Sequence, residues 1–401
     1  MIKRKLLQDL KDHLSKKEIS LIVGPRQAGK TTLMMFLKKY LEKNGEKTLF
    51  LNLDIEADNQ FFKSQELLVR KIQLELGQTG GCVFIDEIQR KENAGLFLKG
   101  LYDMQLPYKF IVSGSGSLEL KEKIHESLVG RKMLFDLNTI SFEEFVNYKT
   151  ADKYHGNLQG FFEIEKEKTS HLLNEYLNFG GYPRVVLEET GKEKRKIIDE
   201  IYRSYIEKDI SYLLNVEKLD AYSMLIKILA GQIGQLINYS ELANTIRLSA
   251  PTINNYMHYS EATFILRRLT PYFTNIRKEI TKSPVAYFYD LGLRNYSLGI
   301  FGHLYNPNEL GYVFENFVFN LLLEKLRFSG CSLHYWRTKD KSEVDFVIRC
   351  GSKVLPVEIK YIKSGKLHID RSLRNFIARY EPENAFIVTP GSSDSFQVEQ
   401  T

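Results

Sequence analysis

A glycine-rich loop near the amino terminus, residues 24–31 (GPRQAGKT), constrains the fold of this chain more than any other feature. It has the form G-x-x-x-x-G-K-[ST] and lies between an apolar run, residues 19–23, that suits a buried strand, and residues 32–41, whose apolar side chains recur with helical spacing. A strand, a glycine loop and a helix N-terminus together form a concave set of backbone N–H groups that face phosphate oxygens. We therefore expect a nucleoside triphosphate to bind here. The residues expected to contact it are Gly24, Pro25, Arg26, Gln27, Ala28, Gly29, Lys30, Thr31 and Thr32.

The residue types in and after this loop predict how the phosphates are held. Lys30 reaches the β- and γ-phosphates, and the Thr31 hydroxyl joins the shell of a Mg²⁺ ion. Downstream, the apolar residues 82–85 are followed by Asp86 and Glu87, the pattern of a Walker B strand. Asp86 at the strand tip would hold the Mg²⁺, and Glu87 would polarise the attacking water. This second pattern is weak by itself, but the upstream P-loop makes it specific.

Two further residues are candidates for phosphate contact. A strand expected at residues 109–113 ends in polar residues, and a side chain at its tip would sense the γ-phosphate. Ser115 is the first choice and Ser113 the alternative, although a simple polar turn also explains the pattern. Arg131 precedes another apolar run, residues 133–137. Its guanidinium either contacts phosphates, in its own subunit or a neighbour's, or is a surface cation.

Several of these segments together resemble the prokaryotic AAA-type ATPases, and more narrowly those fused to a C-terminal PD-(D/E)XK nuclease-like domain. The resemblance implies ATP and Mg²⁺ as cofactors and ATP hydrolysis as the activity. It also permits a homo-oligomer, although no residue demands one. The family usually has Pro-Leu-Ser-Phe where this chain has Thr139-Ile140-Ser141-Phe142, a conservative departure. The segments that carry the resemblance are residues 24–33, 84–89, 113–115, 130–131 and 140–145.

The C-terminal part carries a second candidate site. A helix expected at residues 311–326 includes Glu315, and Asp345 begins a strand. Glu358 and Lys360 share one face of the next strand, because strand side chains alternate. Carboxylates bind Mg²⁺, the metal polarises the scissile phosphate, and the lysine orients the attacking water. The order Glu315, Asp345, Glu358, Lys360 resembles the PD-(D/E)XK nuclease core, in which the first three would hold the metal and Glu358 and Lys360 would act in catalysis. Such pairs of residues also occur by chance on amphipathic strands.

The middle of the chain predicts a winged helix-turn-helix. One helix begins at residues 224–229, and a short second helix is expected at residues 239–246. Ser249 then caps a third helix with Pro251 in its first turn, and an apolar strand follows. Such a unit either binds DNA or serves only as a packing module. The expected recognition helix has no Lys or Arg, so phosphate contacts would come from its neighbours. These neighbours are Arg267, Arg268, Arg277 and Lys278.

The length of 401 residues suggests two to four folding units, all of α/β or helical type. We expect a P-loop ATPase of the AAA type, a helical lid or linker, the winged helix and a restriction-endonuclease-like α/β domain. The boundaries expected for these four units are 1–150, 151–220, 221–275 and 276–401. The net charge of +6 permits nucleic-acid contact without arguing for it.

The remaining composition points to a cytoplasmic protein without a membrane segment. No apolar run approaches the length of a bilayer span. Cys82, Cys331 and Cys350 have no metal-ligand spacing, and we interpret them as reduced core residues. The sequence thus predicts an ATPase that couples nucleotide state to DNA binding or Mg²⁺-dependent DNA cleavage. The alternative is a nucleotide-switch protein whose nuclease-like fold binds nucleic acid or a protein without cutting.

Overall fold

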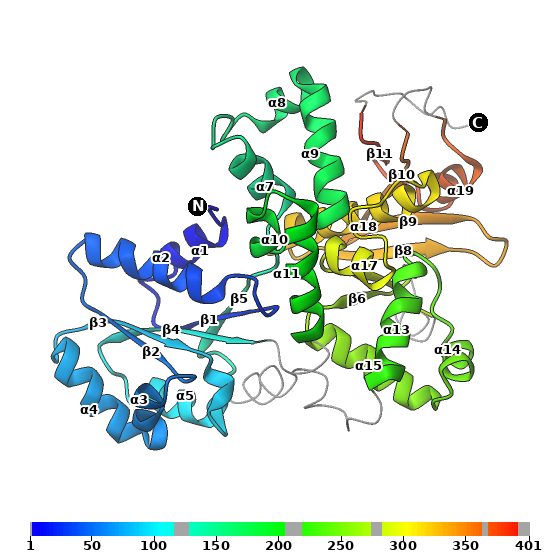
Figure 1. Ribbon diagram of the computed structural model, residues 1–401. Helices are drawn as coiled ribbons and strands as arrows, with labels where there is room; N and C mark the ends of the chain where they lie inside the picture. Colours follow the sequence, from blue (N-terminus) through cyan, green and yellow to red (C-terminus); the bar gives the residue numbers. More distant parts are fainter. Residues whose placement is uncertain (1, 116–127, 205–218, 274–282, 363–367, 392–401) are drawn as a thin grey trace.

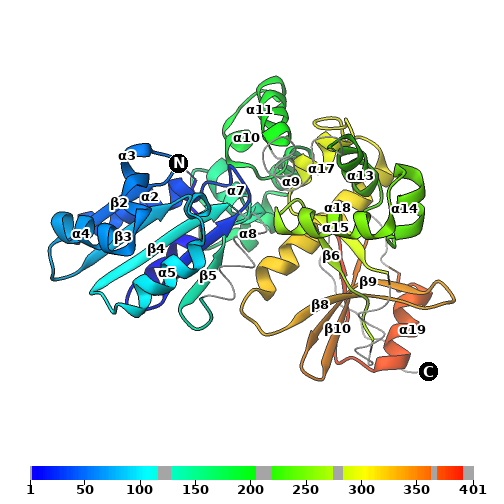
Figure 2. The same ribbon diagram turned by 90° about the horizontal axis from the view of Figure 1, so that it is seen from below.

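The computed structural model describes residues 2–115, 128–204, 219–273, 283–362 and 368–391. An amino-terminal α/β part, drawn in blue and cyan, and a C-terminal part, drawn in yellow to red, lie on opposite sides of the molecule (Figures 1 and 2). The green helices of residues 183–204 lie between them, whereas those of residues 219–262 lie beside the C-terminal part. Within the described residues, no helix combines the length and the apolar composition that a membrane span requires.

The amino-terminal part is built on a five-stranded parallel sheet with the order β2-β3-β4-β1-β5. Its three inner strands, β3, β4 and β1, are mostly apolar and buried on both faces, as expected when helices cover both sides of a parallel sheet. The strands are β1 (Ile19–Gly24), β2 (Thr48–Asn52), β3 (Gly81–Asp86), β4 (Tyr108–Ser115) and β5 (Lys132–Asp136).

Helices cover both faces of this sheet. The face that includes Ile22 and Phe84 packs against α1 and α2, and the face that includes Leu21 and Val83 packs against α4 and α5. This division follows from the alternation of side chains along each strand. The helices, with the short α3, are α1 (Leu6–Asp12), α2 (Lys30–Lys43), α3 (Glu56–Asn59), α4 (Gln65–Leu76) and α5 (Ala94–Asp103).

A set of helices follows β5. Helix α9 ends where Gly180 adopts a φ of 72°, and α10 begins at Pro183, so the glycine-proline turn breaks the helix as predicted. The backbone N–H of Ile140 donates to the carbonyl of Gly181 over 2.7 Å, which places this turn against the segment that leaves the sheet. The helices are α7 (Phe142–Lys149), α8 (Leu158–Ile164), α9 (Lys166–Phe179), α10 (Pro183–Leu187) and α11 (Gly191–Ser204).

Three more helices precede an antiparallel pair of strands. They are α13 (Leu219–Gly231), α14 (Tyr239–Ile246) and α15 (Ala250–Ala262), followed by β6 (Leu266–Leu269) and β7 (Val285–Phe288). Strand β7 pairs with β6. The expected unit boundary at 275/276 therefore falls between two strands that belong to one ribbon, and the structure does not divide the chain there.

The C-terminal part is a four-stranded sheet covered by helices. Its order is β11-β10-β9-β8, with β9 antiparallel to both neighbours and β11 parallel to β10. Helix α18 belongs to an apolar cluster that also contains residues of α7, α9, β9 and β10, so the middle and C-terminal parts share one core. The elements are α17 (Leu291–Ser297), α18 (Pro307–Leu326), β8 (Ser332–Arg337), β9 (Glu343–Cys350), β10 (Lys353–Ile359), α19 (Arg371–Tyr380) and β11 (Phe386–Val388).

The interpretation of all three cysteines as reduced was wrong for two of them. Cys331 and Cys350 form a disulfide that joins the start of β8 to the end of β9. The register pairs Ser332 with Arg349, which brings the two flanking cysteines opposite each other with their Cα atoms 4.4 Å apart. Cys82 is free and buried, as expected. Cross-strand register is a tertiary property, so the spacing in the sequence did not reveal the pair.

Candidate functional site

The P-loop lies where the sequence places it, between the end of β1 and the start of α2. Gly29 has a φ of 95°, a left-handed conformation that glycine adopts without a Cβ clash. A Cβ on Gly24 would lie 2.0 Å from the carbonyl oxygen of Leu137, so the loop and the segment after β5 approach too closely for any other residue. The Lys30 ammonium is buried and donates to the carbonyls of Gly24 at 3.0 Å and Pro25 at 2.8 Å. The Lys30 ammonium, which is expected to bind phosphate, is thus hydrogen-bonded to the backbone of the loop.

A buried carboxylate connects β3 and β4 to the first turn of α2 at the site. Asp86, at the end of β3, accepts a hydrogen bond from the Thr31 hydroxyl at 2.7 Å through Oδ2. Its Oδ1 accepts from the Ser113 hydroxyl and from the backbone N–H of Glu87. Strand β4 lies between β3 and β1, and its register with β3 pairs Ile85 with Val112. Ser113 is therefore brought beside Asp86 by the register of the sheet.

These oxygen atoms fit the ion that the resemblance implies. A hydroxyl and a carboxylate in direct contact at the first turn of the P-loop helix provide the hard oxygen ligands that Mg²⁺ prefers. Thr31 and Asp86 are the residues that would hold it. Ser113 takes the hydrogen-bonding position at the tip of β4, which the sequence analysis named as the alternative to Ser115. The Ser115 side chain lies outside the part of the chain that the structure describes.

Glu87 follows Asp86 in the left-handed conformation, with a φ of 57°, and its carboxylate accepts a hydrogen bond from the Gln89 side chain. Glu87 lines the same cavity as the P-loop, which has a volume of about 590 Å³. The cavity also has apolar walls, supplied by Ile2, Phe36, Ile140, Pro183 and Leu187. The expected general base and the expected phosphate loop therefore face one space.

Arg131 does not reach this space. It immediately precedes β5, and its backbone carbonyl accepts from the N–H of Ile19, the first residue of β1. Its guanidinium pairs with Asp103 at 2.8 Å. The P-loop begins at the other end of β1, about 16 Å away at the usual rise per strand residue. Within one chain, Arg131 is therefore not a phosphate contact, and a role toward a neighbouring subunit stays a prediction.

Two arginines that the sequence analysis did not single out touch the P-loop. Arg184, in the first turn of α10, donates to the side-chain oxygen of Gln27 at 3.0 Å and to Glu200 at 2.7 Å. Arg4, ahead of α1, donates to the carbonyl of Ala28 at 2.9 Å. The glycine-proline turn before Arg184 was visible in the sequence. It is a rigid turn, and in the structure it lies near the P-loop. For Arg4 the sequence offered no comparable signal.

The C-terminal candidates also come together. Asp345 in β9 accepts from the backbone N–H of Ile359 at 2.7 Å, and Glu315 in α18 accepts from the Tyr287 hydroxyl at 2.6 Å. Glu358 in β10 is buried, and one of its oxygens accepts from Lys360 at 2.8 Å. Its other oxygen, Oε2, is buried without a hydrogen-bond partner. Lys360 also pairs with Asp370 at 2.9 Å, a carboxylate that the sequence analysis missed.

Burial and mutual repulsion disturb the ionisation of these carboxyl groups. Burial, and then the charge of Asp345, raise the pKa of Glu358 to about 8, against the opposing effect of Lys360. Burial raises the pKa of Glu315 to about 7, and burial with the charge of Glu315 raises that of Asp345 well above its usual range. Burial and repulsion both disfavour the charged forms.

The metal-ligand geometry is less complete here than at the P-loop. Across the described ranges, no group of three or more His, Cys, Asp or Glu side chains is arranged to hold a metal ion. The unpartnered oxygen of Glu358 and the raised pKa values fit a cation, while Lys360 already neutralises one side of that carboxylate. Glu315, Asp345 and Glu358 are thus close enough to influence one another without forming a closed metal site.

Comparison with protein families assigns the amino-terminal part. Residues 16–146 match the model of a family described as "AAA domain". This part of the chain is therefore similar to AAA domains. Its match covers the P-loop, Asp86, Glu87 and Ser113. Residues 170–304 and 310–400 match two families described as domains of unknown function (DUF8612 and DUF4143), so no activity follows for them.

Two relatives that match most of this chain are described as uncharacterized. An uncharacterized protein of Mycobacterium tuberculosis is 28% identical, covering 95% of this chain and 78% of that protein. An uncharacterized protein of Methanocaldococcus jannaschii is 26% identical, covering 87% of this chain and 76% of the relative. The solved structure of AMPPCP-bound DnaA from Aquifex aeolicus aligns over 63% of this chain and 86% of that chain, with a TM-score of 0.28 and 15% identity. That similarity is too low to establish a shared overall fold.

Proposed function

We propose that this protein is an ATPase whose AAA domain binds ATP with Mg²⁺ at the P-loop. Its nucleotide state would control DNA binding or DNA cleavage by the C-terminal half. The observation that carries the ATPase proposal is the hydrogen-bonded set of Thr31, Asp86 and Ser113 beside a P-loop that faces Glu87 in one cavity. This arrangement brings the ion ligands and the general base to one place, as phosphoryl transfer requires.

Each residue has a distinct task in that reaction. The N–H groups of the P-loop and the Lys30 ammonium would bind the phosphate oxygens, which requires Lys30 to exchange its loop carbonyls for the ligand. Glu87 would take a proton from the attacking water, and Ser113 would orient the Asp86 carboxylate. A Mg²⁺ held by Thr31 and Asp86 supplies charge neutralisation on the transferred phosphate.

Nucleotide titration and phosphate release by the purified chain test the proposal. Lys30→Ala should weaken ATP binding and abolish hydrolysis, because it removes the cation beside the phosphates. The matched control is Lys39→Ala, which removes an exposed lysine from the same helix, α2, and should leave both properties unchanged. Wild-type protein that neither binds nor hydrolyses ATP would refute the ATPase function.

We also propose that α13, α14 and α15, together with β6 and β7, form the winged helix expected at residues 221–275, and that it contacts DNA. The order of three helices followed by the ribbon of β6 and β7 supports the fold, and Ser249 caps α15 as expected, accepting from the N–H of Thr252 at 3.2 Å. Asn254, Asn255 and His258 are exposed on α15, while Arg267 is exposed on β6. Arg277 and Lys278 lie outside the described residues. DNA remains the proposed partner on the strength of this architecture alone.

A second activity, metal-dependent DNA cleavage, is proposed for the C-terminal carboxylates. The specific observation in its favour is the buried, unpartnered Oε2 of Glu358 beside Asp345 and Glu315. Carboxylates kept partly protonated by burial gain their charge when a cation binds. The alternative is a fold that binds nucleic acid or a protein without cutting, in which the contacts of Lys360 with Glu358 and Asp370 only stabilise the sheet.

Incubation of plasmid and branched DNA with Mg²⁺ or Mn²⁺, with and without ATP, distinguishes DNA cleavage from binding without cleavage. Asp345→Ala or Glu358→Ala should abolish cleavage and spare ATP hydrolysis, Lys360→Ala should depress cleavage, and Glu315→Gln should have the mildest effect. Glu383→Gln, at an exposed ion pair with Lys353 on the same sheet, is the matched control. Absence of cleavage by wild-type protein together with absence of calorimetric ion binding would leave the binding-switch alternative.

A further inference from the structure

The amino-terminal segment before α1 contains a buried arginine that contacts the P-loop. The side chain of Arg4 is only 9% exposed, and its ion-pair partner Glu144 is 8% exposed. A buried guanidinium requires partners for its donors, because an unpaired buried charge is costly. Its four acceptors are the carboxylate of Glu144 at 3.1 Å and the backbone carbonyls of Ala28 at 2.9 Å, Asn138 at 2.6 Å and Thr139 at 3.3 Å.

The contact with Ala28 has a direct consequence for phosphate binding. In a planar trans peptide the C=O of one residue and the N–H of the next point in opposite directions. By holding the carbonyl of Ala28, Arg4 also orients the N–H of Gly29 to the opposite side of that peptide. Gly29 is the second glycine of the P-loop and has a left-handed φ of 95°.

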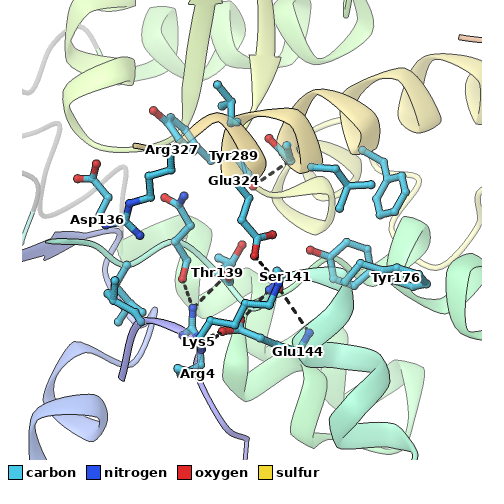
Figure 3. Close-up of a pocket in the computed structure, with 18 residues that line it drawn as sticks. Arg4, Lys5, Asp136, Thr139, Ser141, Glu144, Tyr176, Tyr289, Glu324 and Arg327 are labelled. Carbon is cyan, nitrogen blue, oxygen red and sulfur yellow. Dashed lines mark hydrogen bonds and ion pairs between the residues drawn. The ribbon is translucent and has the colours of Figure 1, made fainter. Parts of the chain in front are cut away.

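The partner of Arg4 is itself held in place. Glu144 is the N3 residue of the capping box at the start of α7, where it accepts from the backbone N–H of Ser141 at 3.0 Å. It also accepts from the backbone N–H of Lys5 at 2.7 Å. One carboxylate therefore fixes Arg4, Lys5 and the start of α7 together, and Figure 3 shows these groups converging at the junction of the two halves of the molecule.

The next residue extends this set of contacts to the C-terminal half. The Lys5 ammonium donates to Glu143 at 2.5 Å and to Glu324 of α18 at 2.9 Å, with its side chain 41% exposed (Figure 3). Helix α18 also carries Glu315, one of the C-terminal carboxylates. A continuous series of ion pairs and hydrogen bonds thus runs from the P-loop carbonyl of Ala28 to the last turn of α18.

We propose that Arg4 is a positioning residue that orients the P-loop peptide for phosphate binding, and that Lys5 connects this orientation to α18. ATP binding then makes α18 more rigid through the ion pair between Lys5 and Glu324. This inference rests on the proposed nucleotide binding at the P-loop. It adds a regulatory link between that site and the C-terminal half, carried by two adjacent residues at the amino terminus.

The first test measures ATP affinity by calorimetry and the melting temperature without nucleotide, for wild type, Arg4→Gln and Arg4→Lys. Loss of a hydrogen bond to a charged group predicts about tenfold weaker ATP binding for Arg4→Gln. Arg4→Lys keeps the charge but not the forked geometry, so it should fall between the two. The control is Lys3→Gln, at an exposed ion pair with Asp152, which should bind ATP like wild type. A purely structural role would lower the melting temperature and leave the affinity of the folded protein unchanged.

The second test measures hydrogen exchange of residues 307–326 with and without a non-hydrolysable ATP analogue. Wild type should exchange more slowly with the analogue, and Lys5→Gln or Glu324→Gln should lose that difference while still binding ATP. Equal ATP affinity in wild type and Arg4→Gln, or an unchanged exchange response in Lys5→Gln, would overturn the inference while the ATPase proposal stands. Failure of wild-type protein to bind ATP would instead overturn the ATPase proposal and the inference together.

Discussion

The hydroxyl of Thr31 donates to the carboxylate of Asp86 over 2.7 Å, although 55 residues separate the two in the chain. Thr31 lies in the first turn of α2, and Asp86 ends β3, which is two strands away from the P-loop strand in the sheet. The contact exists because the strands run parallel and end at one edge, where ligand sites of open α/β sheets form. It provides the oxygen pair on which the proposed ATP·Mg²⁺ site depends.

Replacement of the expected general base should separate binding from hydrolysis. Glu87→Gln keeps the size of the side chain but removes its basicity, so ATP affinity should persist while turnover falls by about two orders of magnitude. Nucleotide titration and steady-state phosphate release measure the two quantities. Turnover at the wild-type rate would mean that Glu87 is not the base.

Ser113 should matter for the site more than for the fold. Ser113→Ala removes a buried donor from Asp86 and should lower the free energy of unfolding by about 1–3 kcal/mol and slow ATP hydrolysis. Ser20→Ala is the matched control, because Ser20 is a buried serine of the neighbouring β1 whose hydroxyl lies 2.8 Å from His13 Nδ1. A comparable loss of stability with normal hydrolysis is expected for that control. If Ser113→Ala and Ser20→Ala hydrolyse ATP at the same rate, Ser113 has no role in the site.

Stability should depend on pH through the C-terminal carboxyl groups. Burial raises the pKa of Glu358 from 4.5 to about 8, so the folded chain holds a proton that the unfolded chain releases at lower pH. Its contribution to the free energy of unfolding is therefore full below about pH 4.5 and is lost as pH rises through about 8. For one carboxyl the slope is at most about 1.4 kcal/mol per pH unit.

Urea unfolding from about pH 5 to about pH 8 measures this dependence. Glu358→Gln should flatten the curve, because its side chain does not titrate, and Glu383→Gln should not. If a divalent ion binds at this site, adding Mg²⁺ should stabilise the wild type more at the higher pH, where the ligands are charged. A curve that is identical in wild type and Glu358→Gln would contradict the raised pKa.

The two arginines of β6 should behave differently toward DNA. Arg268 is engaged by Glu261 at 2.6 Å and by Asn254 at 3.0 Å, whereas Arg267 is exposed. If the winged helix contacts phosphates, Arg267→Ala should reduce the slope of log affinity against log salt concentration by about one. Arg268→Ala should mainly lower stability. Duplex binding measured over a salt series tests this, and an unchanged slope in Arg267→Ala would move the contact elsewhere.

Much of the architecture follows from local patterns in the sequence. The P-loop, the strand before it and the helix after it are contiguous, and the structure confirms their positions within a few residues. The break at Gly180 to Pro183 and the cap of α15 by Ser249 are local as well, because they depend on backbone conformations that particular residue types favour. Features that depend on a few consecutive residues could therefore be predicted from the sequence.

Register and packing decided the rest. Short contiguous segments were enough to predict that residues 24–31 form a loop between a strand and a helix and that Asp86 ends a strand. Three other features could be seen only after folding: Ser113 reaches Asp86, Arg131 lies at the opposite end of β1 from the P-loop, and Cys331 faces Cys350. It likewise brought Arg4 onto the carbonyl of Ala28. These contacts depend on which strands are neighbours and on which segments pack across the junction, and no local pattern encodes either.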